Sequence, residues 1–210
     1  MRHRRQQRAS SPRSQAVRHP LVRSFLRTSQ LEFHIRTLPD GRAGEVVRRH
    51  LKVGDVVTLD GPFGDAFLRE PEARPLLAMA AGSGLAPIKA IVDRALEVNP
   101  ARETHLYVSA RSADQLYLVE YFRKLVARTP SFRFESVVTG ARPGFRARRL
   151  PEIIAERYGT LHGWVAHTAG PPGFVDAVSA AAVNAGLRPV DLFADAFARS
   201  AGNKSRLREA

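Results

Sequence analysis

From Arg74 onward, short apolar runs alternate with longer amphipathic stretches. Runs of five to eight apolar and β-branched residues between turn signals predict buried strands, and the stretches between them have the spacing of helices. The predicted strands are 76–81, 104–110, 132–139, 163–168 and 190–194, and the predicted helices are 87–98, 113–128, 150–158 and 172–185. Strands that alternate with helices imply parallel pairing through crossovers. The sequence therefore predicts an α/β fold: a five-stranded parallel sheet with helices on both faces.

Residues 31–70 follow a different, turn-rich pattern. Residues 31–35 alternate apolar and polar positions, as in a half-buried strand, and 56–59 form a β-branched run after a Gly54-Asp55 turn. A short helix is expected over 44–51. This segment resembles the last strands of an antiparallel barrel, but about forty residues are too few to bury a barrel core alone. We expect a truncated antiparallel β-barrel remnant, produced by loss of an N-terminal part.

The charge is concentrated at the N-terminus. Residues 1–31 contain eight arginines and no acidic residue, so they supply +8 of the net charge of +13 and leave +5 for residues 32–210. The segment lacks an apolar stretch, which excludes a secretory signal. Its composition favours a solvated, disordered leader over a targeting peptide or a nucleic-acid-binding arm. We expect no nucleic-acid partner.

Several classes of site are excluded by residue type. The chain has no cysteine, which excludes disulfides, thiolate zinc sites and a cysteine-ligated iron–sulfur cluster within it. The histidines show no metal-ligand spacing, so no metal site is expected. No apolar run is long enough to span a bilayer, so no membrane partner is expected and we anticipate a cytoplasmic location.

Chemistry is expected in the loops after the strands, because ligands of open parallel sheets bind at the carboxyl ends. These loops are 82–87, 109–117, 139–146 and 168–174. Gly82 and Gly84 lead from a strand into a helix, where backbone N–H groups can approach a diphosphate. A glycine turn made for steric reasons alone is equally compatible with this pattern. The sequence 170–173, Gly-Pro-Pro-Gly, predicts a stiff backbone shelf after the fourth strand.

Taken in order, the motifs resemble one family. GPFG, AGSGLAPI, SARSADQLY, AGPPGFV and a terminal DAF follow one another as in ferredoxin–NADP⁺ reductase-type flavoproteins, and in particular as in the reductase components of bacterial oxygenases. The resemblance spans residues 31–197. It implies an FAD-binding barrel and an NAD(P)H-binding α/β domain, in which hydride passes to the flavin and electrons pass singly to a separate iron–sulfur or oxygenase partner.

The resemblance also implies site residues. Ser83 and Phe197 are expected at the catalytic centre. Ser83 stands where the family usually has Thr. Asp195 and Phe197 match the acidic–aromatic C-terminal ending of the family, whose aromatic ring can cover the face of the flavin. The family commonly has a Cys directly before the Gly-Pro-Pro sequence, and this chain has Ala169 there, so no thiol at this position can contribute to hydride transfer. NADH is favoured over NADPH. The residues expected to contact the pyridine nucleotide are Gly82, Ser83, Gly84, Pro87, Ser109, Arg111, Tyr117, Gly170, Pro171 and Pro172.

Purely structural roles stay open for three of these residues. Arg111 is equally compatible with a surface cation, Tyr117 with core packing on a helix, and Phe197 with apolar filling at the sheet edge.

The flavin half departs from the family pattern. The expected Arg-x-Tyr-Ser/Thr strand corresponds to Arg23-Ser24-Phe25-Leu26, with Phe25 for Tyr and Leu26 for the hydroxyl residue. The phosphate-binding Gly-x-x-Ser/Thr turn corresponds to residues 41–44, where Gly41 is kept and Gly44 stands in place of Ser or Thr. We therefore expect weak FAD binding. The domains expected are a leader (1–30), a partial FAD-binding barrel (31–70), an NAD(P)-binding domain (71–198) and a tail (199–210). Three hypotheses result: a flavin-linked reductase, a non-catalytic nucleotide-binding remnant, and a nucleic-acid-associated protein.

Overall fold

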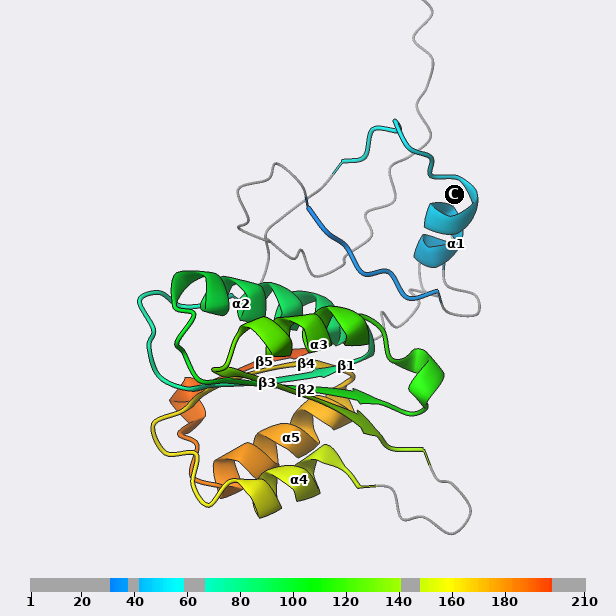
Figure 1. Ribbon diagram of the computed structural model, residues 1–210. Coiled ribbons are helices and arrows are strands. Elements are labelled where there is room, and N and C mark those ends of the chain that lie inside the picture. Colours follow the sequence, from blue (N-terminus) through cyan, green and yellow to red (C-terminus); the bar gives the residue numbers. More distant parts are fainter. Residues whose placement is uncertain (1–30, 38–41, 59–66, 141–147, 198–210) are drawn as a thin grey trace, which may run out of the picture.

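A computed structural model describes residues 31–37, 42–58, 67–140 and 148–197. Its centre is a parallel sheet of five strands in the order β3-β2-β1-β4-β5, which confirms the predicted sheet (Figure 1). The strands are β1 (Leu76–Ala81), β2 (Thr104–Ala110), β3 (Phe132–Val138), β4 (Val165–Gly170) and β5 (Leu192–Ala196). From β1 the chain adds β2 and β3 on one side and then β4 and β5 on the other. The parallel neighbours β1 and β4 therefore flank the switch point where doubly wound sheets bind ligands.

Helices cover both faces of the sheet. Figure 1 shows α2 and α3 on one face and α4 and α5 on the other, as the alternating pattern predicts. The α-helices are α1 (Arg42–Arg49), α2 (Leu85–Val98), α3 (Val119–Arg128), α4 (Leu150–Arg157) and α5 (Pro172–Asn184), and the 3₁₀ turns are η1 (Gly82–Gly84), η2 (Ala113–Gln115) and η3 (Pro189–Asp191). No helix in the described part of the chain is both long and apolar enough to cross a membrane.

Two apolar clusters hold the layers together. Leu76 and Ala78 of β1 belong to the cluster under α2 and α3, whereas Leu77 and Met79 belong to the cluster over α4 and α5. Successive strand residues point to opposite faces, so a strand covered on both sides has to be apolar throughout. The LLAMAA sequence of β1 meets that requirement, and its first five residues are buried.

The predicted helix over 113–128 is wrong in its first half. The chain makes the short turn η2, then leaves helical geometry over 116–118, and α3 begins at Val119. Leu118 has a φ of 59°, a left-handed conformation that a continuous helix excludes. Tyr117 therefore lies in a linker and not on a helix.

The structure shows no strand of the expected barrel remnant within the described residues. Residues 31–37 and 51–58 contain no strand, whereas the short helix expected over 44–51 is confirmed as α1. A strand is stable only when a neighbour pairs with its N–H and C=O groups, and no described strand lies beside either segment. Val53 and Val56 consequently stand fully exposed. The leader and the C-terminal tail lie outside the described residues.

Candidate functional site at the carboxyl ends of β1 and β4

The turn η1 joins the carboxyl end of β1 to α2, and its glycines are required by geometry. Gly82 has a φ of 58°, in the left-handed region that favours glycine. A Cβ placed on Gly84 would overlap the carbonyl group of Ala169 in β4. Gly84 therefore lets the start of α2 lie directly against the end of β4, and the two neighbouring strands and the helix meet at one point.

The amino end of α2 offers backbone donors. Neither η1 nor α2 has a side-chain cap hydrogen bond, and neither carries an acidic residue in its first turn. Uncapped N–H groups and the positive end of the helix dipole together suit an anion such as a diphosphate. Ser83 is half-buried at this end of the helix, and Pro87 is buried within its first turn.

A second loop forms the rigid shelf expected at 170–173. Gly170 has a φ of 153°, and Pro171 and Pro172 follow as the N-cap and first residue of α5. Both prolines are exposed. The Phe197 N–H donates to the Gly170 carbonyl at 2.8 Å, so the residue after β5 lies next to this shelf.

Tyr117 and Ser109 approach the same corner from β2 and the linker after it. The Tyr117 hydroxyl donates to the Gly82 carbonyl at 3.3 Å and lies 2.8 Å from Nδ1 of His34. Burial, aided by the charge of Glu32, raises the pKa of Tyr117 to about 12, so its phenol is neutral at physiological pH. Ser109 is buried and paired in register with Ala81.

The ten residues expected around the pyridine nucleotide therefore lie at the carboxyl edge of the sheet, from η1, α2, the end of β2 and its following linker, the end of β4 and the start of α5. Arg111 is exposed there, directly after β2. Asp195 lies near the end of β5, where burial raises the pKa of its carboxyl. The individual roles of these residues in nucleotide binding and catalysis stay predictions.

The N-terminal segment contributes residues that the sequence pattern did not single out for the site. Glu32 accepts hydrogen bonds from His34 at 2.7 Å and from Lys89 of α2 at 3.1 Å. A guanidinium nitrogen of Arg36 lies 3.6 Å from the position of a Cβ on Gly82. These contacts join residues far apart in sequence, 57 positions for Glu32 and Lys89, so no local pattern marks them.

The described residues include little of the expected flavin site. Arg23, Phe25 and Gly41 lie outside them, as does the GPFG motif at 61–64. Gly44 lies in α1, where a Cβ would come within 3.1 Å of Cα of Thr37. Because residues 31–37 and 51–58 form no strand, they supply no barrel wall for a flavin.

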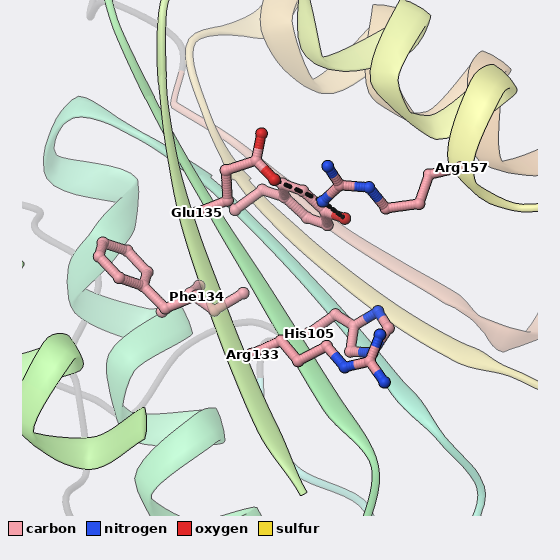
Figure 2. Close-up of a pocket in the computed structure, with 7 residues that line it drawn as sticks. His105, Arg133, Phe134, Glu135 and Arg157 are labelled. Carbon is pink, nitrogen blue, oxygen red and sulfur yellow. Dashed lines mark hydrogen bonds and ion pairs between the residues drawn. The ribbon is translucent and has the colours of Figure 1, made fainter. Parts of the chain in front are cut away.

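A separate hollow of about 130 Å³ lies toward the amino ends of β2 and β3 (Figure 2). Arg157 pairs there with Glu135 and donates to the Tyr107 hydroxyl at 3.1 Å, while His105 and Arg133 line the other side. The Arg157 guanidinium is thus already bonded to Glu135 and Tyr107. The hollow lies at the opposite ends of the strands from the glycine turn, so it is not part of the candidate site. Within the described residues, no three histidine or acidic side chains gather as a metal site.

Comparisons with known proteins agree with this geometry. Residues 79–180 match the family described as the oxidoreductase NAD-binding domain. The ferredoxin–NAD(P)⁺ reductase component of the naphthalene 1,2-dioxygenase system of Pseudomonas putida is 36% identical over 170 residues, covering 80% of this chain and 52% of the relative. The corresponding component of the naphthalene 1,2-dioxygenase/salicylate 5-hydroxylase systems of a Ralstonia species is 37% identical over 171 residues, covering 80% and 52%.

Among solved structures, the cytochrome P450 reductase GcoB of Amycolatopsis is similar with a TM-score of 0.72 and 31% identity, covering 80% of this chain and 52% of that one. The chain spans about half the length of the curated relatives it matches. The glycine turn, the proline shelf, the strand order and these similarities agree: residues 79–180 match the oxidoreductase NAD-binding domain, and the chain is similar to reductase components of bacterial oxygenases.

Proposed function

We propose that this chain is an NAD(P)H-dependent oxidoreductase that passes electrons from a pyridine nucleotide, through FAD, to a separate iron–sulfur or oxygenase partner. The observation that carries the proposal is the meeting of η1, the uncapped start of α2 and the Gly170–Pro172 shelf at the switch point of the sheet. The named relatives, which are reductase components of oxygenase systems, support the same activity. We also propose that the protein is located in the cytoplasm.

The chain's own residues would bind and orient the nucleotide. Backbone N–H groups of η1 and the first turn of α2 would hold the diphosphate, and the Ser83 hydroxyl would lie beside it. Pro171 and Pro172 would present a rigid surface to the nicotinamide ring. When bound, the nicotinamide supplies the hydride. We propose NADH as the nucleotide, with Arg111 at the end of β2 as the nearest candidate for a 2′-phosphate contact if NADPH binds instead.

The electron acceptor would be a separate protein. With no cysteine among these 210 residues, they cannot supply the thiolate ligands of an iron–sulfur cluster, and the proposed cluster lies in the separate partner. The net positive charge would attract an acidic partner, and their association rate should fall as salt rises.

A second candidate function is favoured by one observation, the absence of strands over the described residues 31–37 and 51–58. A chain that binds the pyridine nucleotide but not flavin would be a nucleotide-binding module without reductase activity. The two functions share the nucleotide site and differ only in flavin binding.

Calorimetry with NADH and NADPH, followed by absorbance after purification with added FAD, separates these functions. The reductase requires stoichiometric flavin that NADH bleaches anaerobically. Nucleotide binding with no retained flavin would support the binding module. A well-folded chain that binds neither nucleotide would refute both.

A further inference from the structure

The chain that follows β3 is bonded to the end of β2, directly before Arg111. The Thr139 N–H donates to the Ala110 carbonyl at 2.9 Å, and the Thr139 hydroxyl donates to the same oxygen at 3.3 Å. These bonds extend the pairing of the two strands one residue beyond its last pair, Ala110 and Val138. The backbone at Thr139 is therefore tied to the residue that precedes Arg111.

The next residue, Gly140, has no room for a side chain. A Cβ placed on Gly140 would lie 2.2 Å from the carbonyl oxygen of Arg111 and 3.3 Å from its carbonyl carbon. Unlike Gly82, Gly140 does not have a positive φ, so close contact and not backbone conformation is the reason for glycine here. Carbon and oxygen atoms that are not bonded stay about 3.3 Å apart, so an added methyl group would displace the two backbones by about 1 Å.

Arg111 lies on the strand next to the proposed diphosphate site. Ser109 pairs in register with Ala81, the residue before η1, and Arg111 lies two residues, about 7 Å, further toward the carboxyl edge. Its side chain is exposed, and no acidic side chain of the described residues forms an ion pair with it. The adenosine ribose of a pyridine dinucleotide is bonded to the diphosphate, so the 2′ position of this ribose lies within reach of a residue one strand away.

We propose that Thr139 and Gly140 are positioning residues that hold Arg111 at the 2′ position of the adenosine ribose. This inference rests on the proposed function, because it concerns the same nucleotide site. A guanidinium recognises a phosphate through two parallel hydrogen bonds, and these bonds need a fixed direction. Residues 139–140 thus act on cofactor choice through the backbone of Arg111. NADH remains the proposed nucleotide, and the quantity that they influence is the ratio of the NADPH affinity to the NADH affinity.

The first test measures the role of Arg111 by calorimetry with NADPH and NADH, which differ only in the 2′-phosphate. Arg111→Ala removes a charge-assisted contact to that phosphate and should weaken NADPH binding about tenfold at low salt. NADH binding should change by no more than about twofold, since a neutral 2′-hydroxyl interacts less strongly with the guanidinium. The NADPH deficit should shrink as the ionic strength rises.

The second test adds the methyl group at position 140. Gly140→Ala should lower the NADPH-to-NADH affinity ratio about fivefold, because a guanidinium misplaced by about 1 Å loses its directed hydrogen bonds. In an Arg111→Ala background the same substitution should leave the ratio unchanged. Gly159→Ala is the matched control, because Gly159 is also exposed and has nothing within 4 Å of its Cβ position.

A third pair of variants tests the tie at Thr139 without any added bulk. Thr139→Val removes the hydroxyl bond to Ala110 and keeps the N–H bond, so the affinity ratio should fall about twofold. Thr139→Ser keeps the hydroxyl and should restore the wild-type ratio. Thermal melting checks that each variant is folded. A purely structural role would lower the melting temperature or weaken both nucleotides equally, and would leave their ratio unchanged.

Each outcome supports or contradicts a separate statement. A folded wild-type chain that binds neither nucleotide would refute the proposed function itself. A wild-type chain that binds NADH alone, or an Arg111→Ala variant with the wild-type ratio, would overturn the inference while the proposed function stands. A Gly140→Ala variant with the wild-type ratio, or with the same change of ratio in the absence of Arg111, would overturn the positioning role of Gly140. Equal ratios for Thr139→Val and Thr139→Ser would overturn that of the Thr139 hydroxyl.

Discussion

Replacing Gly84 by alanine tests whether the start of α2 depends on contact with β4. Gly84 has φ −59° and ψ −15°, ordinary helical values that alanine adopts freely. Conformation alone would therefore favour the substitution. The added Cβ, however, would overlap the carbonyl of Ala169 and crowd the N–H of Gly170, and both are backbone atoms of a central strand.

The two effects have opposite signs and unequal size. Alanine gains about 0.4–1 kcal/mol over glycine, because its unfolded chain has less conformational entropy to lose. Forcing a methyl group into a packed site costs about 1–3 kcal/mol, and the upper end or more applies when backbone has to move. We expect a net loss of about 2 kcal/mol, which lowers the melting temperature of a domain this size by about 4–8 °C. The displaced turn should also weaken NADH binding.

Urea unfolding measures the change, and Gly173→Ala is the matched control. Gly173 lies in the first turn of α5 and has open space at the Cβ position. There the same substitution should raise stability by about 0.5 kcal/mol. A Gly84→Ala variant as stable as wild type, with an unchanged dependence on urea, would refute the contact between α2 and β4 as the reason for glycine.

Three further variants probe other contacts. Tyr117→Phe removes the hydroxyl that donates to Gly82 and should cost about 1 kcal/mol in urea unfolding and several-fold in NADH affinity by calorimetry. Burial, and secondly the positive charges of nearby guanidiniums, lowers the pKa of His167 to about 3. The stability of the wild-type protein should therefore fall as pH drops below about 6.5, and the His167→Gln variant should lose this dependence. A variant with the same pH profile as wild type would contradict the role of His167. Hydrogen bonds, led by that from Arg188, lower the pKa of Asp191; Asp191→Asn should cost about 1 kcal/mol at pH 7. That deficit should shrink as pH falls below the ordinary carboxyl pKa of about 4, and a deficit independent of pH would contradict the ion pairs.

The α/β part of the fold was largely predictable because its central strands β1, β2 and β4 are buried on both faces. The bounds of β1 and β2 agree with the predicted 76–81 and 104–110. Strands β4 and β5 begin two residues later than predicted, since Gly163 has a φ of 82° and Pro189–Asp191 form a 3₁₀ turn. Turns of this kind hardly change the hydrophobic pattern of the sequence, so the pattern does not show where the strand begins.

The N-terminal segment was not predictable from its own pattern. Alternation over 31–35 indicates that Glu32 and His34 face solvent, but their side chains contact α2 and Tyr117 instead. The partners that decide this lie 57 and 83 positions away. The reason for Gly84 could not be predicted from the sequence either. The sequence shows only a glycine at the turn, whereas the structure shows that a side chain there would overlap the backbone of β4.

The main-chain bond from Phe197 to Gly170 makes position 197 a suitable place for engineering. Any residue except proline can donate this N–H to Gly170, while the Phe197 side chain itself packs against the cluster under α2 and α3. Substituting other aromatic, small or polar residues at 197 should therefore vary the chemistry beside the Gly170–Pro172 shelf while this main-chain bond is kept. A set of such variants would show how side-chain size and polarity at this edge tune cofactor choice.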